Sequence, residues 1–248
     1  MLRRHFLGAA LAAPTLLRSR GARANTPVDV ELVLAVDVSR SVDPEEQELQ
    51  FTGYADAFRD PRLIEGIMGG PIGAIAVQMF TWSDWNIQKT IVPWTKLDSP
   101  ASAHRLAQAI DDAPRQTWLY TSISGAMDFA RQQFGQGFEG SRRVVDISGD
   151  GVNNSGRPVA EAREAALAEG IVLNGLAVLD RAPLSRAALT TGLPPLDDYY
   201  RDEVIGGPGA FLVVAEGFAA FEAAVRRKII REIAVAPPPG PMVERVFA

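Results

Sequence analysis

The chain has 248 residues, a formal net charge of −5, two histidines and no cysteine, and 47% of its residues are hydrophobic. This length suits one sizeable α/β domain, and the hydrophobic fraction excludes a wholly disordered chain. The absence of cysteine excludes disulfides, thiolate zinc sites, iron–sulfur clusters and a cysteine nucleophile. The negative charge argues against nucleic acid as the main partner.

The first 24 residues have the composition of an export signal. Residues 1–24 contain arginine but no acidic residue, with an apolar run over 6–17 followed by Ala22-Arg23-Ala24. The segment Arg3-Arg4-His5-Phe6-Leu7 resembles the twin-arginine export motif, although Leu2 stands where serine or threonine is usual. These features predict a signal peptide, a periplasmic or secreted location and a mature chain that does not span a membrane. The alternative interpretation is an amphipathic helix on a cytoplasmic protein.

The remaining residues alternate between predicted strands and helices. Apolar, β-branched runs indicate strands, and cap residues such as Asp43, followed by Pro44, indicate helix starts. The short polar segment 83–86 predicts one antiparallel strand pair. The order predicts an α/β fold with a mostly parallel sheet, one short antiparallel strand and helices on both faces. In chain order the predicted elements are strand 28–36, helices 44–59 and 61–69, strands 72–82 and 87–92, helices 100–112 and 122–134, strand 142–148, helix 158–170, strands 171–178 and 210–214, and helix 217–233.

Five oxygen-bearing side chains are candidates for a metal site. Asp37, Ser39 and Ser41 alternate directly after the first predicted strand, where open α/β sheets bind ligands. Thr121 precedes a predicted helix, and Asp150 follows a later strand between two glycines. A set of carboxylates and hydroxyls suits Mg²⁺ or Mn²⁺ better than zinc. We therefore expect one divalent cation where the three segments meet.

These five residues, in their order, separation and context, resemble the metal-ion-dependent adhesion site of von Willebrand factor A domains. The resemblance covers residues 28–233. Residues 121–126, 149–154 and 204–211 are more narrowly similar to an uncharacterised family of exported bacterial A-type domains. The five positions together make the match specific, whereas the first three alone form a weak pattern.

The resemblance implies a Rossmann-like three-layer sandwich over residues 25–236, followed by a Pro-rich tail at 237–248. In such domains a divalent cation lies at the upper edge of the sheet. Many A domains carry glycines where this chain has Trp118-Leu119-Tyr120. This departure predicts a bulkier loop that partly shields the metal.

The resemblance also implies a role for each candidate ligand. Ser39 and Ser41 would bind the metal directly. Asp37 and Asp150 would bind it directly or through water, and Thr121 in either way. The open sixth position commonly accepts a carboxylate from a partner protein.

Several of these polar residues have simpler interpretations. Asp37 and the two serines after it would then form an ordinary turn, and Asp43 is expected to be a helix cap. Asp146, inside an apolar strand, is expected to pair with a nearby arginine. Asn153 and Asn154 are either turn residues or part of a recognition rim.

Motifs for catalysis are missing from the sequence. Beyond the predicted signal, His104 is the one histidine, and neither a G-x-S-x-G elbow nor a phosphate-binding G-x-x-x-x-G-K-[ST] loop occurs. A phosphatase of the haloacid-dehalogenase type would use Asp37 as its nucleophile, but it expects a second aspartate where Ser39 stands. Another alternative is an A domain that works with an AAA+ ATPase in metal-cofactor insertion, which the export signal disfavours. We predict an exported, noncatalytic module that binds Mg²⁺ or Mn²⁺ and engages a carboxylate of a partner protein.

Overall fold

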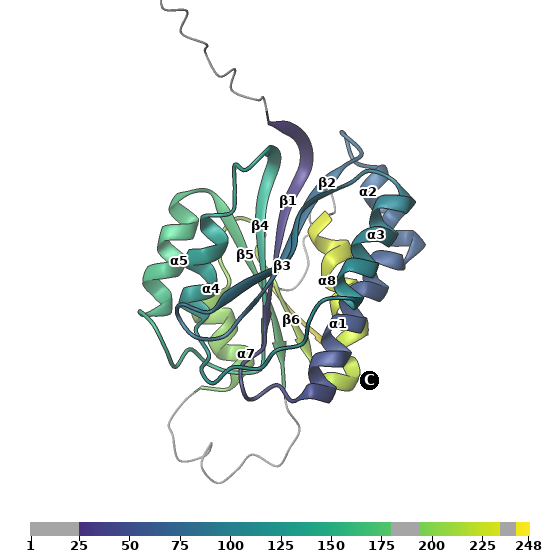
Figure 1. Cartoon of the computed structure of the whole chain (residues 1–248). Helices are drawn as coiled ribbons and strands as arrows, with labels where there is room; N and C mark the ends of the chain where they lie inside the picture. The colour runs from purple at the N-terminus through teal and green to yellow at the C-terminus, as the bar shows by residue number, and fades with distance from the viewer. Residues whose placement is uncertain (1–24, 180–193, 234–241) are drawn as a thin grey trace, which may run out of the picture.

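The computed structural model describes residues 25–179, 194–233 and 242–248 (Figure 1). The predicted signal peptide and residues 237–241 of the predicted tail lie outside these ranges. None of the helices in the described ranges has the length and apolar character needed to cross a membrane.

A seven-stranded sheet forms the middle layer of the molecule. Its strands are β1 (Thr26–Asp37), β2 (Ile75–Trp82), β3 (Gln88–Leu97), β4 (Phe138–Gly149), β5 (Ile171–Val178), β6 (Leu212–Ala215) and β7 (Val243–Val246). They lie in the order β3-β2-β1-β4-β5-β6-β7. β3 is antiparallel to β2, and every other neighbouring pair is parallel. The predicted mostly parallel sheet with one antiparallel strand is confirmed.

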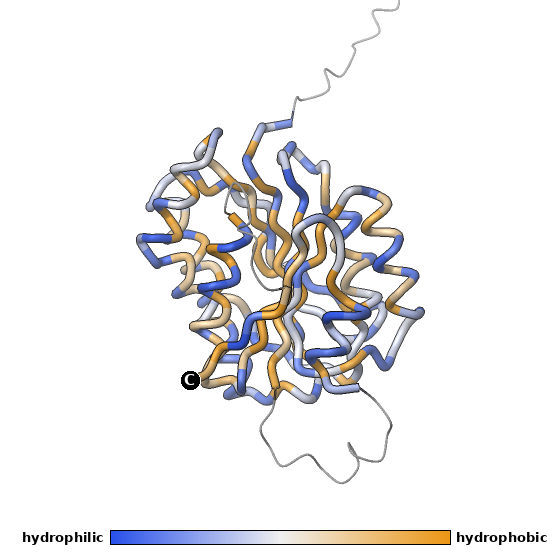
Figure 2. The backbone as a smooth tube through the Cα atoms, turned by 180° about the vertical axis from the view of Figure 1, so that it is seen from behind, coloured by the Kyte–Doolittle hydropathy of each residue, from blue (hydrophilic) through white to orange (hydrophobic). Residues whose placement is uncertain are grey.

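Helices cover both faces of this sheet. They are α1 (Pro44–Arg59), α2 (Pro61–Met68), α3 (Pro100–Asp111), α4 (Ile123–Arg131), α5 (Val159–Ala168), α7 (Leu196–Tyr199), the π-helix η1 (Tyr200–Val204), the 3₁₀-helix η2 (Phe218–Ala220) and α8 (Phe221–Ile233). One face carries α1, α2, α3 and α8, and the other carries α4, α5 and α7 (Figure 1). Apolar residues concentrate in the strands between these two layers (Figure 2), so each face of the sheet has its own core.

The start of α1 shows how local sequence determines a boundary. The Asp43 carboxylate accepts a hydrogen bond from the Glu46 backbone N–H at 2.8 Å, and the Glu46 carboxylate accepts one from the Asp43 N–H at 2.9 Å. Pro44 occupies the first turn, where its missing N–H costs nothing. The predicted cap is confirmed, and Asp43 is thereby accounted for without a ligand.

Three short features were not predicted: the edge strand β7, the helix α7 and the π-helix η1. Residues 243–246, within the predicted tail, form the edge strand β7, which pairs with β6 from Leu212↔Val243 onward. The turn of π-helix at η1 places Tyr200 in the core beneath the sheet edge. Segments of four or five residues carry too little periodicity to be recognised, and tertiary pairing decides their conformation.

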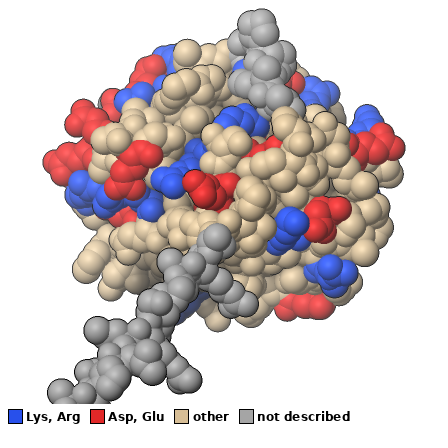
Figure 3. Space-filling view, turned by 90° about the horizontal axis from the view of Figure 1, so that it is seen from above, with Lys and Arg blue, Asp and Glu red and all other residues tan. Residues whose placement is uncertain are grey.

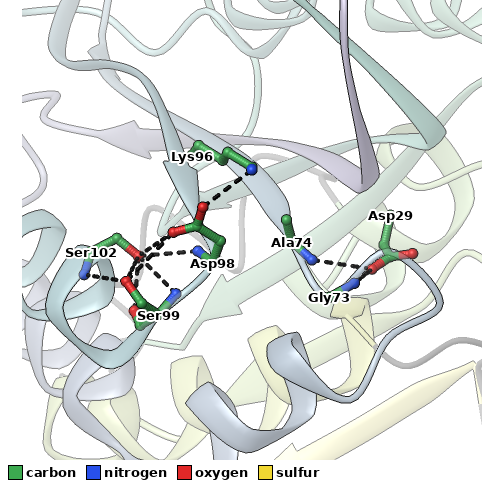
Figure 4. A network of polar contacts seen from close by, with 7 residues as sticks. All are labelled: Asp29, Gly73, Ala74, Lys96, Asp98, Ser99 and Ser102. Carbon is green, nitrogen blue, oxygen red and sulfur yellow. Dashed lines mark hydrogen bonds and ion pairs between the residues drawn. The ribbon is translucent and has the colours of Figure 1, made fainter.

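The end of the molecule where β1 begins is held by local polar contacts. The Asp29 carboxylate accepts hydrogen bonds from the backbone N–H groups of Ile72, Gly73 and Ala74 at 3.0–3.4 Å, which fixes the turn before β2 (Figure 4). Nearby, Lys96 pairs with Asp98 at 3.1 Å. Acidic and basic side chains are interspersed over this end (Figure 3).

The order of strands reverses at β1, which places the candidate site. The chain passes from β1 to β2 on one side and later to β4 on the other. Val36 of β1 lies beside Ser148 of β4, so both strands end at the same edge of the sheet. Loops that follow them therefore meet in the crevice where open α/β sheets bind ligands.

Candidate metal centre

The loops after β1 and β4 and the loop before α4 bring all five candidate ligands into one cluster. The Thr121 hydroxyl donates to Ser39 Oγ at 3.2 Å, and Ser39 Oγ lies 3.1 Å from Ser41 Oγ. The Ser41 hydroxyl donates to Asp150 Oδ1 at 2.6 Å. Asp37 joins through its Oδ1, which accepts the Ser39 backbone N–H at 2.7 Å. Residues up to 113 positions apart in the chain thus share one hydrogen-bonded group, as the spacing predicted.

Asp37 is the most unusual member of this cluster. Its side chain has no exposure to solvent, and its Oδ2 has no hydrogen-bond partner among the described residues. Burial, reinforced by the nearby charge of Asp150, raises the pKa of Asp37 well above its usual value, while the Ser39 hydrogen bonds oppose the shift. A buried carboxylate with an unsatisfied oxygen is costly unless a proton or a cation compensates it.

Asn153 and Asn154 connect the loop after β4 to the segment that carries Thr121. The Thr121 backbone N–H donates to Asn154 Oδ1 at 2.9 Å, and the Asn154 N–H donates to the Thr121 carbonyl at 2.8 Å. The Ser124 N–H donates to Asn153 Oδ1 at 3.1 Å. These hydrogen bonds cross-link the two loops, a role that differs from both the turn and the recognition rim considered for these asparagines. Their position three and four residues after Asp150 was the available signal.

Tyr200 is a residue of this region that the sequence did not reveal. It is completely buried, and its hydroxyl, like Asp37 Oδ2, has no hydrogen-bond partner among the described residues. A Cβ atom at Gly149 would lie 2.7 Å from Tyr200 Oη and 2.9 Å from Asp37 Oδ2, so the two oxygens are no farther apart than the sum of these distances. Burial and the charge of Asp37 raise the pKa of Tyr200 well above its usual value. Glycine at 149 lets both oxygens approach the backbone beside the cluster.

An open hollow of about 740 Å³ gives access to the cluster. The hydroxyl-bearing residues Ser41 and Thr121 form part of its lining, and Leu119 forms one wall. The loop that carries Leu119 is fixed to the end of β1, because the Trp118 N–H donates to the Val38 carbonyl at 3.0 Å. This loop borders the hollow and leaves it open. The remaining lining residues are Arg40, Gly151, Val152 and Asn154.

Asp146 belongs to a different group, and its predicted pairing was wrong. Its carboxylate pairs with the Lys228 ammonium at 2.7 Å rather than with an arginine, and Lys228 also pairs with Glu232. All three side chains are buried between β4 and α8. A lysine on the last helix is distant in sequence from Asp146, so no local pattern marked it as the partner.

The chemistry of the five-residue cluster fits a hard divalent cation. It offers two carboxylates and three hydroxyls, and every donor atom is oxygen, which Mg²⁺ and Mn²⁺ prefer. Within the described ranges no group of three or more His, Cys, Asp or Glu side chains is placed to hold a metal. Hydroxyl ligands are therefore required for a cation to bind here with more than two protein ligands.

Residues 27–237 match the model of one protein family, described as a protein of unknown function (DUF1194). The chain belongs to this family. The match covers most of the predicted domain at 25–236. No curated protein matches the sequence.

Solved structures show that the chain has a von Willebrand factor A fold. One similar structure is that of proximal thread matrix protein 1 from the mussel byssus, with a zinc-occupied metal-ion-dependent adhesion site. It is 15% identical to this chain, and the match has a TM-score of 0.57 and covers 84% of this chain and 48% of the mussel protein. A von Willebrand factor type A protein from Catenulispora acidiphila is 12% identical, covers 83% of this chain and 43% of its own, and has a TM-score of 0.55. BatB from Bacteroides thetaiotaomicron is 18% identical, covers 84% of this chain and 100% of its own, and has a TM-score of 0.52. The chain spans less than half the length of the first two, and at these identities the likeness concerns the fold.

Proposed function

We propose that this protein is an exported, noncatalytic module that binds a divalent cation and uses it to engage a carboxylate of a partner protein. The ligands would be Asp37, Ser39, Ser41, Thr121 and Asp150, and the cation Mg²⁺ or Mn²⁺. The observation that carries the proposal is the buried, unpartnered Asp37 Oδ2 at a cluster of hydroxyls. Export rests on the composition of residues 1–24.

The surrounding residues would position the ligands before the cation arrives. The Ser39 N–H orients the Asp37 carboxylate, and Asn154 holds the Thr121 backbone through two hydrogen bonds. A bound cation would supply the positive charge that Asp37 lacks among the described residues, together with a free coordination position for an incoming carboxylate. Preorganised ligands lose little conformational freedom on binding, which favours affinity.

Two comparisons support the proposal. The mussel byssus protein with the same fold has a zinc-occupied metal-ion-dependent adhesion site. A pilus adhesin, SpaC from Lactobacillus rhamnosus GG, is a second protein of this fold, with a TM-score of 0.58 and 14% identity, and covers 85% of this chain and 31% of its own. Metal binding and adhesion therefore both occur on this fold.

The burial of Asp37 disfavours the phosphatase alternative. A nucleophilic carboxylate must reach a phosphorus atom in line with the leaving group, but Asp37 has no exposed surface. His104, the other group considered for catalysis, lies on the exposed side of α3. These placements favour a binding function.

The proposal is tested by metal titration of the wild type and two matched variants. Calorimetry and thermal unfolding with Mg²⁺, Mn²⁺ or Zn²⁺ are expected to show saturable binding, and a hundredfold excess over Kd adds about 2.7 kcal/mol of stability. Asp37→Asn should abolish this response. Asp43→Asn should retain it, because Asp43 caps α1 and asparagine is an equally good cap.

An unchanged metal response in Asp37→Asn would refute the site. Hydrolysis of a generic phosphate ester by the wild type, lost in the same variant, would favour the phosphatase instead. A preference for Zn²⁺ over Mg²⁺ and Mn²⁺ would support the proposed site but would show that its cation is zinc.

A further inference from the structure

The hollow beside the five-residue cluster has an asymmetric lining. Leu119 and Val152 are apolar, whereas Arg40 is a cation on the loop that also carries Ser41. Arg40 is exposed and takes part in none of the ion pairs formed within the described residues. The site therefore offers a free positive charge and an apolar wall next to the proposed cation.

The apolar wall is held rigidly although it faces solvent. Leu119 is 67% exposed, and its neighbours Trp118 and Tyr120 are also exposed. The backbone beneath them is fixed at both ends, because the Trp118 N–H donates to the Val38 carbonyl and the Ser83 hydroxyl donates to the Tyr120 carbonyl. Exposed apolar side chains on a fixed backbone are typical of binding anchors, since little entropy is lost when a partner covers them.

Further contacts fix the approach to this loop. The Gln47 side-chain amide, on α1, donates to Thr117 Oγ1 at 2.6 Å and to the Gln116 carbonyl at 3.3 Å. Ser39 also pairs with Trp118 in an isolated parallel bridge. The three apolar side chains are therefore displayed by a loop that is anchored to β1, to α1 and to the turn between β2 and β3.

The charges of the occupied site favour an acidic partner. A divalent cation would add two positive charges beside the cluster, and Arg40 adds another at the rim of the hollow. A partner that presents one carboxylate to the cation and a second to Arg40 would match both. A purely acidic chain, however, would leave Leu119 uncovered.

We propose that the hollow recognises an acidic protein segment in which an apolar side chain stands next to the metal-binding carboxylate. The apolar side chain packs against Leu119 and Val152, and a further acidic side chain pairs with Arg40. This inference rests on the proposed function, because the first carboxylate needs the bound cation. It adds the chemical nature of the partner, which neither the fold nor the five ligands determine.

The probe is a library of random peptides displayed on phage and selected on the full-length chain in Mg²⁺, with elution by EDTA. We expect eluted clones to carry Asp or Glu next to Leu, Ile, Val, Met or an aromatic residue. A synthetic peptide from such a clone is then titrated against variants. Leu119→Ser should weaken its binding tenfold or more, on the order of the loss of one buried leucine contact. Arg40→Gln should weaken it several-fold.

Matched controls separate this surface from general effects of substitution. Leu49→Ser changes an exposed leucine of α1, and Arg105→Gln changes an exposed arginine of α3, and both should bind the peptide like the wild type. Leu119→Ser and Arg40→Gln should keep the wild-type Kd for Mg²⁺ and the wild-type unfolding temperature.

The outcomes distinguish this inference from the proposed function. If Mg²⁺ binds but the eluted clones lack the acidic–apolar pair, or no clone requires Mg²⁺, the inference is overturned and the metal site stands. Equal peptide affinity for the wild type and Leu119→Ser also overturns it. If calorimetry detects no metal binding at all, the proposed function fails and this inference fails with it.

Discussion

Buried carboxylates occur both between β4 and α8 and at the end of β1, and the two places differ in the source of the counter-charge. Asp146 and Glu232 face the Lys228 ammonium, which comes from α8 of the same chain. Glu232 also accepts a hydrogen bond from the Asn174 side chain at 3.1 Å. Asp37, at the end of β1, has Asp150 nearby and no cationic partner among the described residues. The first group thus holds a cation of its own chain, and under the proposed function the second would receive one from solution.

Under the proposed function, this difference separates a structural group from a binding site. Both groups are costly to bury, and both raise carboxylate pKa values through desolvation. The Lys228 group is buried between the sheet and a helix, and its ammonium lies within reach of both carboxylates. The Asp37 group lies under hydroxyls that line an open hollow. A buried acid without its own cation, next to an opening, is therefore the informative feature.

The largest expected effect on stability comes from removing the ammonium group of Lys228. Lys228→Met leaves Asp146 and Glu232 buried without a positive charge, so we expect a loss of about 3–5 kcal/mol in the free energy of unfolding. Urea unfolding measures it. Arg227→Met, an exposed neighbour on α8, is the matched control and should cost little. Equal losses in the two variants would contradict the structural role of Lys228.

A second test measures how the free energy of unfolding depends on pH. Burial raises the pKa of Glu232 from its usual 4.5 to about 7. The charge of Lys228 opposes this shift, and the charge of Asp146 reinforces it. A carboxyl whose folded pKa is raised contributes stability that is complete below its unfolded pKa and is lost as pH rises through the folded value. The free energy of unfolding should therefore fall by roughly 3 kcal/mol between pH 4.5 and pH 8 on account of this group.

Two variations identify the groups responsible for that loss. Glu232→Gln should flatten the dependence of unfolding free energy on pH. Asp37, whose pKa is also raised, should add a further loss that saturating Mg²⁺ removes. An identical pH profile in wild type and Glu232→Gln would show that the buried pair is not the origin.

The smallest expected effect comes from the backbone beside Asp37. In Gly149→Ala the new methyl group would meet Tyr200 Oη and Asp37 Oδ2 at less than 3.0 Å, so one of them must move. We expect a cost of about 1–3 kcal/mol in stability and a weaker Kd for Mg²⁺, measured by calorimetry. Gly151→Ala is the control, because its methyl group would meet Thr121 at an ordinary 3.6 Å. Unaltered metal affinity in Gly149→Ala would argue against a tight arrangement of these oxygens.

Local patterns were sufficient for most of the fold. The Asp43 cap determined the start of α1, and the apolar run before Asp37 marked β1 as a buried parallel strand. The order of strands and helices then implied a mostly parallel sheet, whose strand ends meet at one edge. Positions after strands and before a helix, together with the resemblance to the adhesion site, predicted the five candidate ligands.

Other features depended on contacts between distant segments. Lys228 as the partner of Asp146, Tyr200 beside Gly149 and the β7 edge strand all arise from packing between segments that no short-range pattern relates. The sequence by itself determined the elements, their order and the residues available for a cation, since periodicity, capping and strand ends are local properties. Only the tertiary structure decided which buried acid receives a lysine and which lies without a cation near an open hollow, because charge compensation in a core depends on spatial neighbours.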